Sequence, residues 1–171
     1  MNPMQNVRIE KLTLNVGAGK DQKMLEKGAK LLKNLTGIEP VKTVTNKRVQ
    51  AWHLRPGLPI GVKITLRGAQ AEELLPKLLS AKENVLKETC FDDHGNVSFG
   101  IPEYVDIEDA KYDPDIGIIG LQASVTLDRA GYRVKKRKLQ KGKIPATHKV
   151  GKQDAIAFMK EKYGVTTGEE A

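Results

Sequence analysis

Alternation of apolar and polar residues predicts where the strands of this chain lie. In the clearest case, residues 60–66, every second residue is apolar: Ile60, Val62, Ile64 and Leu66. Such alternation is typical of a strand that buries one face and exposes the other. Alternation or short apolar runs predict further strands at residues 12–16, 41–45, 97–101 and 119–127.

Three other segments have the spacing of amphipathic helices. The first lies between Asp21, a candidate N-cap, and Gly37, a candidate helix stop. The second is expected over about residues 70–87, with Pro76 near its start or at a kink. The third is expected over residues 151–163.

The order of these elements predicts an α+β fold with helices packed on one face of an antiparallel-rich sheet. The opposite face of the strands is polar, with Lys11, Thr13, Asn15, Lys63, Thr65, Arg67, Ser98, Gln122, Ser124 and Thr126. We expect this face to stay open and to suit sugar and phosphate oxygens. We expect a single domain, residues 1–171, with a core, a basic arm, a C-terminal helix and a flexible tail: residues 7–128, 129–152, 153–164 and 165–171.

Basic residues are concentrated in two stretches that contain no acidic residue, residues 40–71 and 129–153. These stretches hold 16 of the 29 lysines and arginines, so they carry +16 while the rest of the chain carries −8. The net charge of +8 understates this segregation. A chain that separates its charge in this way is expected to bind a polyanion.

Composition argues against several other classes of protein. The length of 171 residues suits one domain, and the single cysteine, Cys90, excludes an internal disulfide and a cysteine-rich zinc site. No apolar run approaches the ~20 residues that span a bilayer. Residues 1–10 lack the order of a signal peptide. We therefore expect a soluble, cytoplasmic protein without a membrane partner.

The sequence contains no recognisable catalytic or metal site. The three histidines are scattered, and no nucleophile and base have a known spacing. A local acidic cluster fits solvated turns or a contact with a basic partner: Asp106, Glu108, Asp109, Asp113 and Asp115. We predict no enzyme, no metal and no cofactor.

The segment Gly17-Ala18-Gly19-Lys20 lies between a predicted strand and a predicted helix, as nucleotide-binding loops do. Leu14 and Asp21 stand where a Walker A loop needs glycine and serine or threonine. Gln22 stands where the dinucleotide fingerprint needs a third small residue. We favour a tight turn with backbone amides near an RNA phosphate, and a nucleotide-dependent enzyme is the alternative.

Two basic segments have the composition of nucleic-acid contacts. The arm is either a solvated tail or a segment that lies extended along nucleic-acid backbone and orders on binding. Its candidate contacts are Arg133, Lys135, Lys136, Arg137, Lys138, Lys141, Lys143 and Lys149. In the long loop of residues 46–59, Trp52 is either a core residue or an exposed platform for a base.

Several motifs resemble one known family in order and spacing: Asn15-Val16-Gly17-Ala18-Gly19, Leu35-Thr36-Gly37, residues 54–68, Phe91-Asp92-Asp93-His94-Gly95-Asn96 and residues 117–127. Over residues 7–130 the chain is similar to the 5S-rRNA-binding protein of the large ribosomal subunit, numbered five in the bacterial and archaeal scheme. The remainder resembles the archaeal and eukaryotic branch, and we favour the archaeal one. Bacterial members carry Gln-Lys where this chain has Ile38-Glu39, so a contact through that glutamine is not carried over.

The resemblance implies a cytoplasmic structural constituent of the large subunit. It implies that the polar sheet face binds 5S rRNA through Asn15 and Thr65, with Lys63 and Arg67 beside them, and the strand pattern adds Lys11 and Thr13. It implies that the loop of residues 45–54 reaches the P-site tRNA, with Asn46, Lys47, Arg48, Gln50, Trp52 and His53. Contacts with 23S rRNA in the central protuberance and with other 5S-associated ribosomal proteins are also implied. A non-ribosomal RNA chaperone or adaptor of the same fold is the alternative.

Overall fold

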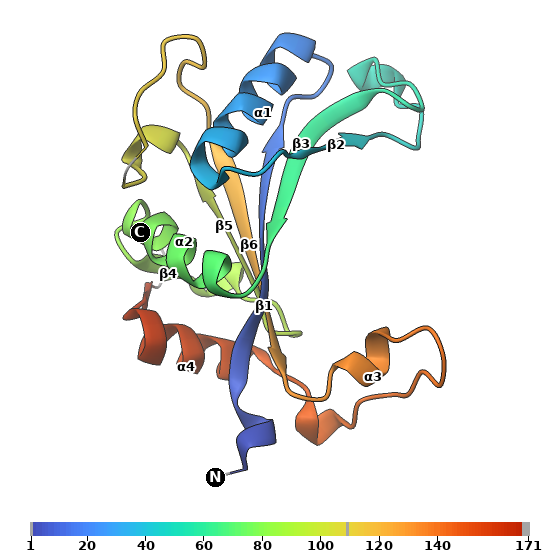
Figure 1. The fold of residues 1–171 in the computed structure, drawn as a ribbon, viewed down its shortest axis with the longest axis vertical. Helices are drawn as coiled ribbons and strands as arrows, with labels where there is room; N and C mark the ends of the chain where they lie inside the picture. The colour runs from blue at the N-terminus through green and yellow to red at the C-terminus, as the bar shows by residue number, and fades with distance from the viewer. Residues whose placement is uncertain (1, 109, 169–171) are drawn as a thin grey trace. The chain divides into compact units, whose positions relative to one another are not determined.

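The computed structural model describes residues 2–108 and 110–168 (Figure 1). The strands are β1 (Val7–Gly17), β2 (Val41–Val44), β3 (Pro59–Leu66), β4 (Val85–Lys87), β5 (Asn96–Ile101), β6 (Leu121–Arg129) and β7 (Thr166–Gly168). The α-helices are α1 (Gln22–Thr36), α2 (Ala69–Ser80), α3 (Arg133–Lys136) and α4 (Lys152–Tyr163). The predicted α+β class is confirmed.

Five strands form one sheet in the order β2-β3-β1-β6-β5, while β4 and β7 form a separate parallel pair. β2 and β3 are antiparallel, with Val41 opposite Lys63, and their register shifts between Thr43 and Val44. β1 is one strand, although its buried residues change phase between Ile9 and Leu12. The sequence shows the same change, because Val7 and Ile9 alternate out of phase with Leu12, Leu14 and Val16.

The chain divides into two compact units. Unit 1 comprises Met1–Leu12, Arg67–Phe99 and Ser124–Ala171, and unit 2 comprises Thr13–Leu66 and Gly100–Ala123. Strands β1, β5 and β6 contribute residues to both units. Helix α1 belongs to unit 2 with β2 and β3, whereas α2, α3, α4, β4 and β7 belong to unit 1.

In unit 2, α1 packs on β3 (Figure 1). The Asp21 side chain caps the helix by accepting from the backbone amide of Lys23 at 2.9 Å, and Gly37 ends it in the left-handed conformation. Gly28 lets the helix approach the sheet closely, because a Cβ there would lie 2.9 Å from Cγ1 of Val16. The buried face of α1 consists of Leu25, Gly28, Leu31 and Leu32.

In unit 1, apolar side chains of α2, α4 and the strands are buried: Leu75, Leu78, Leu79, Val97, Phe99, Val125, Leu127, Ala155 and Met159. Ion pairs hold α4, and in one of them Lys152 lies 2.8 Å from Glu88. Lys162 pairs with Glu72 of α2 at 3.1 Å, and Asp154 pairs with Arg129 of β6 at 3.0 Å. Gly164 ends the helix in the left-handed conformation, as predicted.

The second helix is shorter than predicted. It ends at Ser80 because Glu83 and Asn84 both adopt positive φ, which a right-handed helix does not allow. Pro76 is not near its start, since seven residues of α2 precede it. Val85–Lys87 form β4, in which Val85 is exposed rather than inward.

Part of the predicted flexible tail is a strand. Thr166–Gly168 pair with β4 in parallel, and the amide of Thr166 donates to the carbonyl of Asn84 at 2.9 Å. The rest of the predicted tail, residues 169–171, lies outside the described residues. Within the described ranges, no helix is both long and apolar enough to cross a membrane.

Candidate nucleic-acid interface

In unit 2, alternate strand residues form a surface that we call the polar patch: Thr13, Asn15, Lys63, Thr65 and Gln122. The residues between them, such as Leu14, Val62 and Ile64, are buried. The alternation of β1, β3 and β6 therefore turns polar side chains away from the core.

Two amides and one ammonium group give the polar patch its chemistry. Asn15 Nδ2 donates to Gln122 Oε1 at 3.2 Å, which orients both amides and leaves each with further donor or acceptor capacity. Lys63 is exposed and, among the described residues, has no carboxylate within 4.0 Å. The patch therefore presents directed hydrogen-bonding groups beside an uncompensated positive charge, as RNA sugar and phosphate oxygens require.

In unit 1, charged residues form a different surface, which we call the charge cluster: Arg8, Glu10, Arg67, Asp128 and Lys136. Arg8 Nε lies 2.9 Å from Asp128 Oδ1, and Arg67 Nη1 lies 3.3 Å from Glu10 Oε1. Lys136 Nζ pairs with Glu10 and lies 3.9 Å from Asp128 Oδ2. The Glu10 and Asp128 side chains are only 13% and 7% exposed.

The basic residues of the charge cluster keep Glu10 ionised. Burial raises its pKa, but hydrogen bonds and positive charge from Lys136, together with Arg67 and Lys11, outweigh burial and bring the pKa below its usual value. Arg67 and Lys136, both predicted RNA contacts, are thus engaged within the chain. Sequence reasoning could not find the pairs with Glu10, because Glu10 lies 57 residues before Arg67 and 126 residues before Lys136.

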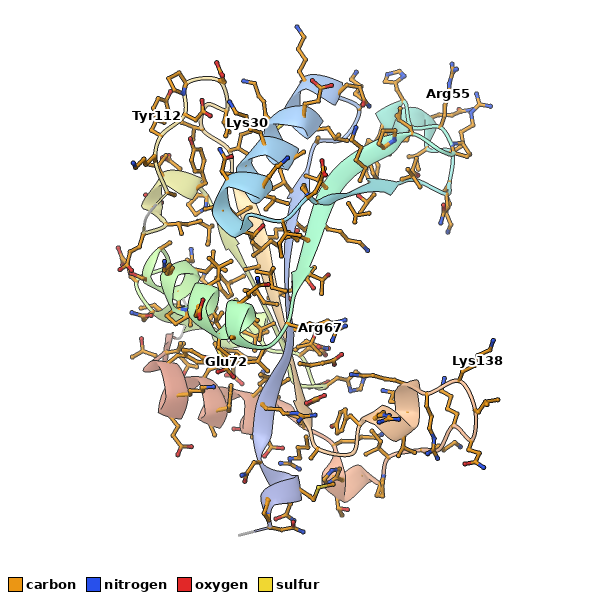
Figure 2. All side chains as sticks on the ribbon, in the orientation of Figure 1. Lys30, Arg55, Arg67, Glu72, Tyr112 and Lys138 are labelled. Carbon is orange, nitrogen blue, oxygen red and sulfur yellow. The ribbon has the colours of Figure 1, made fainter. Side chains whose placement is uncertain are left out.

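The basic arm is a closed loop rather than a wholly extended segment. Helix α3 lies within this loop. Hydrogen bonds join the residues at the start of the loop to those at its end. The Val150 amide donates to Tyr132 Oη at 2.7 Å, and His148 Nε2 lies 2.8 Å from the carbonyl oxygen of Ala130. The predicted arm cations other than Lys136 are exposed and without a described ion pair: Arg133, Lys135, Arg137, Lys138, Lys141, Lys143 and Lys149. Figure 2 shows Lys138 at the outer end of this loop.

The loop between β2 and β3 is also held at its base. The Thr45 amide donates to the carbonyl of Leu58, and the Gly57 amide donates to the carbonyl of Thr45. Nearer the tip, Val49 and Leu54 form an isolated bridge. Trp52 is 69% exposed, so the core alternative for this residue fails, and its role as a platform for a base stays a prediction. The other predicted loop residues are exposed too: Asn46, Lys47, Arg48, Gln50 and His53.

The turn after β1 is not built to hold a phosphate. The amides of Ala18 and Gly19 both donate to the carbonyl oxygen of Ile60, each at 2.9 Å. Because these amides are already bonded, they do not form the cradle that a nucleotide-binding loop needs. The tight turn that we favoured is present, since the Asp21 amide donates to the carbonyl of Ala18 at 3.2 Å, but the amides of Ala18 and Gly19 are not free to bind an RNA phosphate.

The predicted acidic cluster is partly structural. Lys30 of α1 lies 2.8 Å from Asp113 and 3.1 Å from Asp115. The hydrogen bond from Lys30 lowers the pKa of Asp113. Asp106 and Glu108 are exposed, and Asp109 lies outside the described residues. In the part of the chain that the structure describes, no three His, Cys, Asp or Glu side chains gather around a possible metal position.

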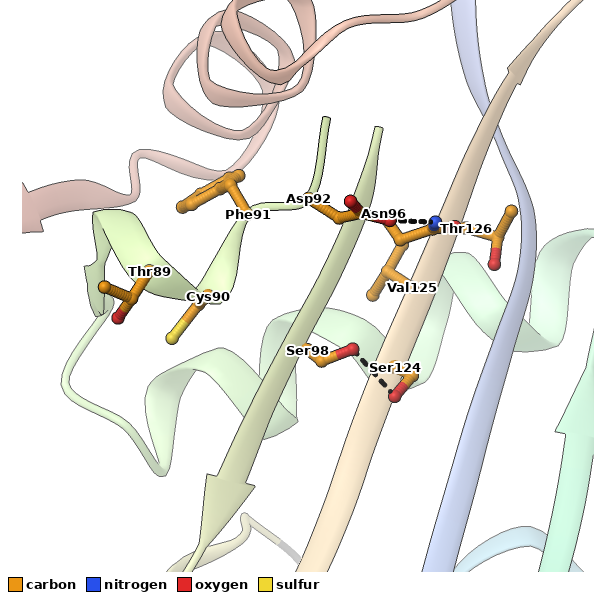
Figure 3. A pocket seen from close by; sticks show the side chains of 9 residues that line it. All are labelled: Thr89, Cys90, Phe91, Asp92, Asn96, Ser98, Ser124, Val125 and Thr126. Atoms are coloured by element: carbon orange, nitrogen blue, oxygen red, sulfur yellow. Dashed lines mark hydrogen bonds between the residues drawn. The ribbon is translucent and has the colours of Figure 1, made fainter. Parts of the chain in front are cut away.

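One cavity in unit 1 was not predicted. It has a volume of about 560 Å³ and is lined by Thr89, Cys90, Phe91, Asp92, Asn96, Ser98, Ser124, Val125 and Thr126 (Figure 3). The polar alternation of β5 and β6 predicted only part of its wall. The rest comes from Thr89 and Cys90, in a 3₁₀ turn over Glu88–Cys90 that no periodicity signals, and from Phe91 and Asp92 directly after it.

Comparison with known proteins gives two family matches and many relatives. Residues 2–55 match the family described as ribosomal protein L5, and residues 59–158 match the model of the C-terminus of the same ribosomal family. The large ribosomal subunit protein uL5 of Nanoarchaeum equitans is 50% identical over 96% of this chain and 97% of its own length. Those of Sulfurisphaera tokodaii and Sulfolobus acidocaldarius are 46% and 47% identical, over 97% and 96% of this chain and 94% and 93% of their own lengths.

The class of the molecule follows from these matches and from its basic α+β fold: it is a ribosomal protein. The chain belongs to the ribosomal protein L5 family. The resemblance found in the motifs is therefore confirmed, including its archaeal branch, because the relatives named above are archaeal. Membership in a family of ribosomal proteins also confirms that the chain is not an enzyme.

Proposed function

We propose that this chain is a structural constituent of the large ribosomal subunit in the cytoplasm, and that it binds 5S rRNA through the polar patch. The observation that carries the proposal is the orientation of Asn15 by Gln122, at 3.2 Å, beside exposed Thr65 and Lys63. Amides held in this way supply directed hydrogen bonds, and Lys63 neutralises a phosphate. The names of the archaeal relatives support the location in the large subunit.

The loop between β2 and β3 and the basic arm are the basis for two further proposed RNA contacts. Exposed Trp52 and its basic neighbours suit the P-site tRNA, because an aromatic ring can stack on a base while cations meet the backbone. The exposed arm cations suit the backbone of 23S rRNA in the central protuberance. The proposed 5S rRNA contacts include Thr13 of the polar patch and Lys11, which lies two residues before it on β1. Other 5S-associated ribosomal proteins complete the proposed set of partners.

Filter binding with purified 5S rRNA tests the proposal. The double substitution Asn15→Ala with Thr65→Ala is expected to weaken binding roughly tenfold to a hundredfold, since it removes two directed hydrogen bonds. The control is Asn34→Ala with Gln153→Ala, which changes exposed residues of α1 and α4. An affinity that the first pair leaves unchanged would show that the polar patch is not the 5S site.

A second experiment tests the place of the chain in the subunit. Tagged chain is expected to co-sediment with the large subunit in high salt, because a structural constituent is held by many contacts at once. A chain that dissociates into the light fractions under those conditions would instead be a non-ribosomal RNA chaperone or adaptor.

A further inference from the structure

The cavity of unit 1 has the size and lining of a binding site for a small polar group. Its volume of about 560 Å³ lies within the range of roughly 300–1,000 Å³ that is usual for small-molecule sites. Hydroxyl groups line much of it, and Figure 3 shows two hydrogen-bonded pairs along it. Asn96 Nδ2 donates to Asp92 Oδ2 at 3.0 Å, and Ser98 Oγ donates to Ser124 Oγ at 3.0 Å.

The charge of the cavity selects against a phosphate. Among the described residues, those that line it include Asp92 but no lysine or arginine. The hydrogen bond from Asn96 lowers the pKa of Asp92, with further support from the amides of Asp93 and His94, so the carboxylate is ionised at neutral pH. An anion in the cavity repels phosphate and attracts N–H donors. This is opposite to the preference of the polar patch, which offers Lys63.

The Asp92 and Asn96 pair presents a defined hydrogen-bonding pattern. After its bond to Asn96, the Asp92 carboxylate retains acceptor capacity on both oxygens, and Asn96 retains one N–H donor. The Watson–Crick edge of guanine is the complement: its O6 accepts, while N1–H and the 2-amino group donate. Adenine, cytosine and uracil do not offer two adjacent donors next to an acceptor. The Ser98 and Ser124 hydroxyls would then meet ribose oxygens.

We propose that this cavity receives an unpaired guanosine of the RNA that the chain binds, with the carboxylate of Asp92 accepting from the base and the amide of Asn96 donating to it. The inference rests on the proposed function, since it takes the ligand from a bound RNA. Reading an unstacked base by its Watson–Crick edge is the usual way in which proteins recognise single-stranded RNA.

An NMR titration of the isotopically labelled full-length chain tests the base. The ligands are four short RNA hairpins that differ in one unpaired nucleotide: guanosine, inosine, adenosine or cytidine. The guanosine hairpin is expected to shift the signals of Asn96, Ser98 and Ser124 and to bind roughly tenfold more tightly than the adenosine and cytidine hairpins. Inosine, which lacks the 2-amino group, should bind with intermediate affinity. Equal affinities, or shifts that miss these residues, would overturn the proposal.

A parallel titration with GMP separates RNA from a free nucleotide. GMP is expected to shift the same signals but to bind more weakly than the guanosine hairpin, because it lacks the contacts that the rest of the RNA makes with the chain. Tighter binding of GMP than of the hairpin would make the cavity a site for free guanine nucleotides and would overturn the RNA assignment.

Asp92→Asn and Asp93→Asn form a matched pair of variants. The first keeps an oxygen that can accept from the turn amides but loses the charge, and it should bind all four hairpins within about twofold of one another. The second changes a neighbouring carboxyl that does not line the cavity and should keep the guanosine preference. A preference that survives in Asp92→Asn contradicts the role of this carboxylate.

Filter binding with 5S rRNA keeps the two proposals distinguishable. If the wild-type chain binds 5S rRNA while the hairpins bind with equal affinity, only the guanosine inference fails. If the chain does not bind 5S rRNA, the proposed function fails, and the hairpin series still decides what the cavity accepts.

Discussion

The polar patch of unit 2 and the charge cluster of unit 1 both include residues of β1 and β6 but differ in available charge. Lys63 in the patch has no described carboxylate within 4.0 Å, whereas Arg67 and Lys136 in the cluster share Glu10. The difference arises from the two nearly buried carboxylates, Glu10 and Asp128. A basic residue on a strand face is therefore a candidate RNA contact only when the fold leaves its charge uncompensated.

The largest effect on RNA binding is expected from reversing the charge of the polar patch. Lys63→Glu should weaken 5S rRNA binding roughly tenfold to a hundredfold, because it replaces a phosphate contact with repulsion. Filter binding measures the loss. Lys23→Glu on α1 makes the same change of net charge at another exposed site of unit 2 and should cost much less. Equal losses in both variants would mean that only net charge matters.

The charge cluster should respond in the opposite direction. Glu10→Gln removes the carboxylate that Arg67 and Lys136 share, so both cations become available to phosphates. We expect binding to 5S rRNA to tighten about threefold, with a steeper dependence on salt concentration. The measurement is filter binding over a series of salt concentrations. A weaker affinity with an unchanged salt slope would show that the cluster is not near the RNA.

The same substitution should lower stability in a way that depends on pH. Because the folded-state pKa of Glu10 is lowered, its contribution to stability is present above its usual pKa of 4.5 and is lost as the pH falls through the folded value. Urea unfolding at neutral pH should show Glu10→Gln to be less stable by roughly 1–2 kcal/mol.

The stability difference between wild type and Glu10→Gln should shrink as the pH falls below 4.5. The groups facing Glu10 are Lys136, Arg67 and Lys11, all of which remain positively charged in this range. Glu26→Gln, an exposed change on α1, is the control and should shift the unfolding midpoint little. A difference that grows on acidification would contradict the assignment of the ion pairs.

The smallest effect is expected for one cation of the arm. Lys138→Ala removes an exposed charge at the outer end of the loop and should weaken RNA binding less than about threefold, while reducing the salt slope by about one. Lys136→Ala should instead lower stability, because it leaves Glu10 with fewer cations. If both variants behaved alike in urea unfolding, the distinction between paired and exposed arm cations would fail.

Sequence reasoning succeeded where one local signal determines the structure. The alternation of residues 60–66 gave β3, and Asp21 and Gly37 gave both ends of α1. It failed at residues 81–87, because the apolar spacing continued while Glu83 and Asn84 left the helical conformation. β4 and β7 are three residues each, so their pairing depends on packing that no short pattern encodes.

The candidate site was predictable to a similar degree. The positions of Asn15, Lys63 and Thr65 follow from period-two alternation. The bond between Asn15 and Gln122 and the ion pairs Glu10–Lys136 and Arg8–Asp128 join residues more than a hundred positions apart, and no periodicity links such residues. The sequence can therefore identify a polar face, while its charge balance requires the tertiary structure.

The exposed indole of the β2–β3 loop is an intrinsic fluorescent probe of what binds to this loop. Trp52 is the single tryptophan of the chain and is 69% exposed. Emission excited selectively from tryptophan therefore reports on one place in the molecule. Stacking on a base would quench it, so any binding of a nucleic acid to this loop can be followed in real time without attaching a dye.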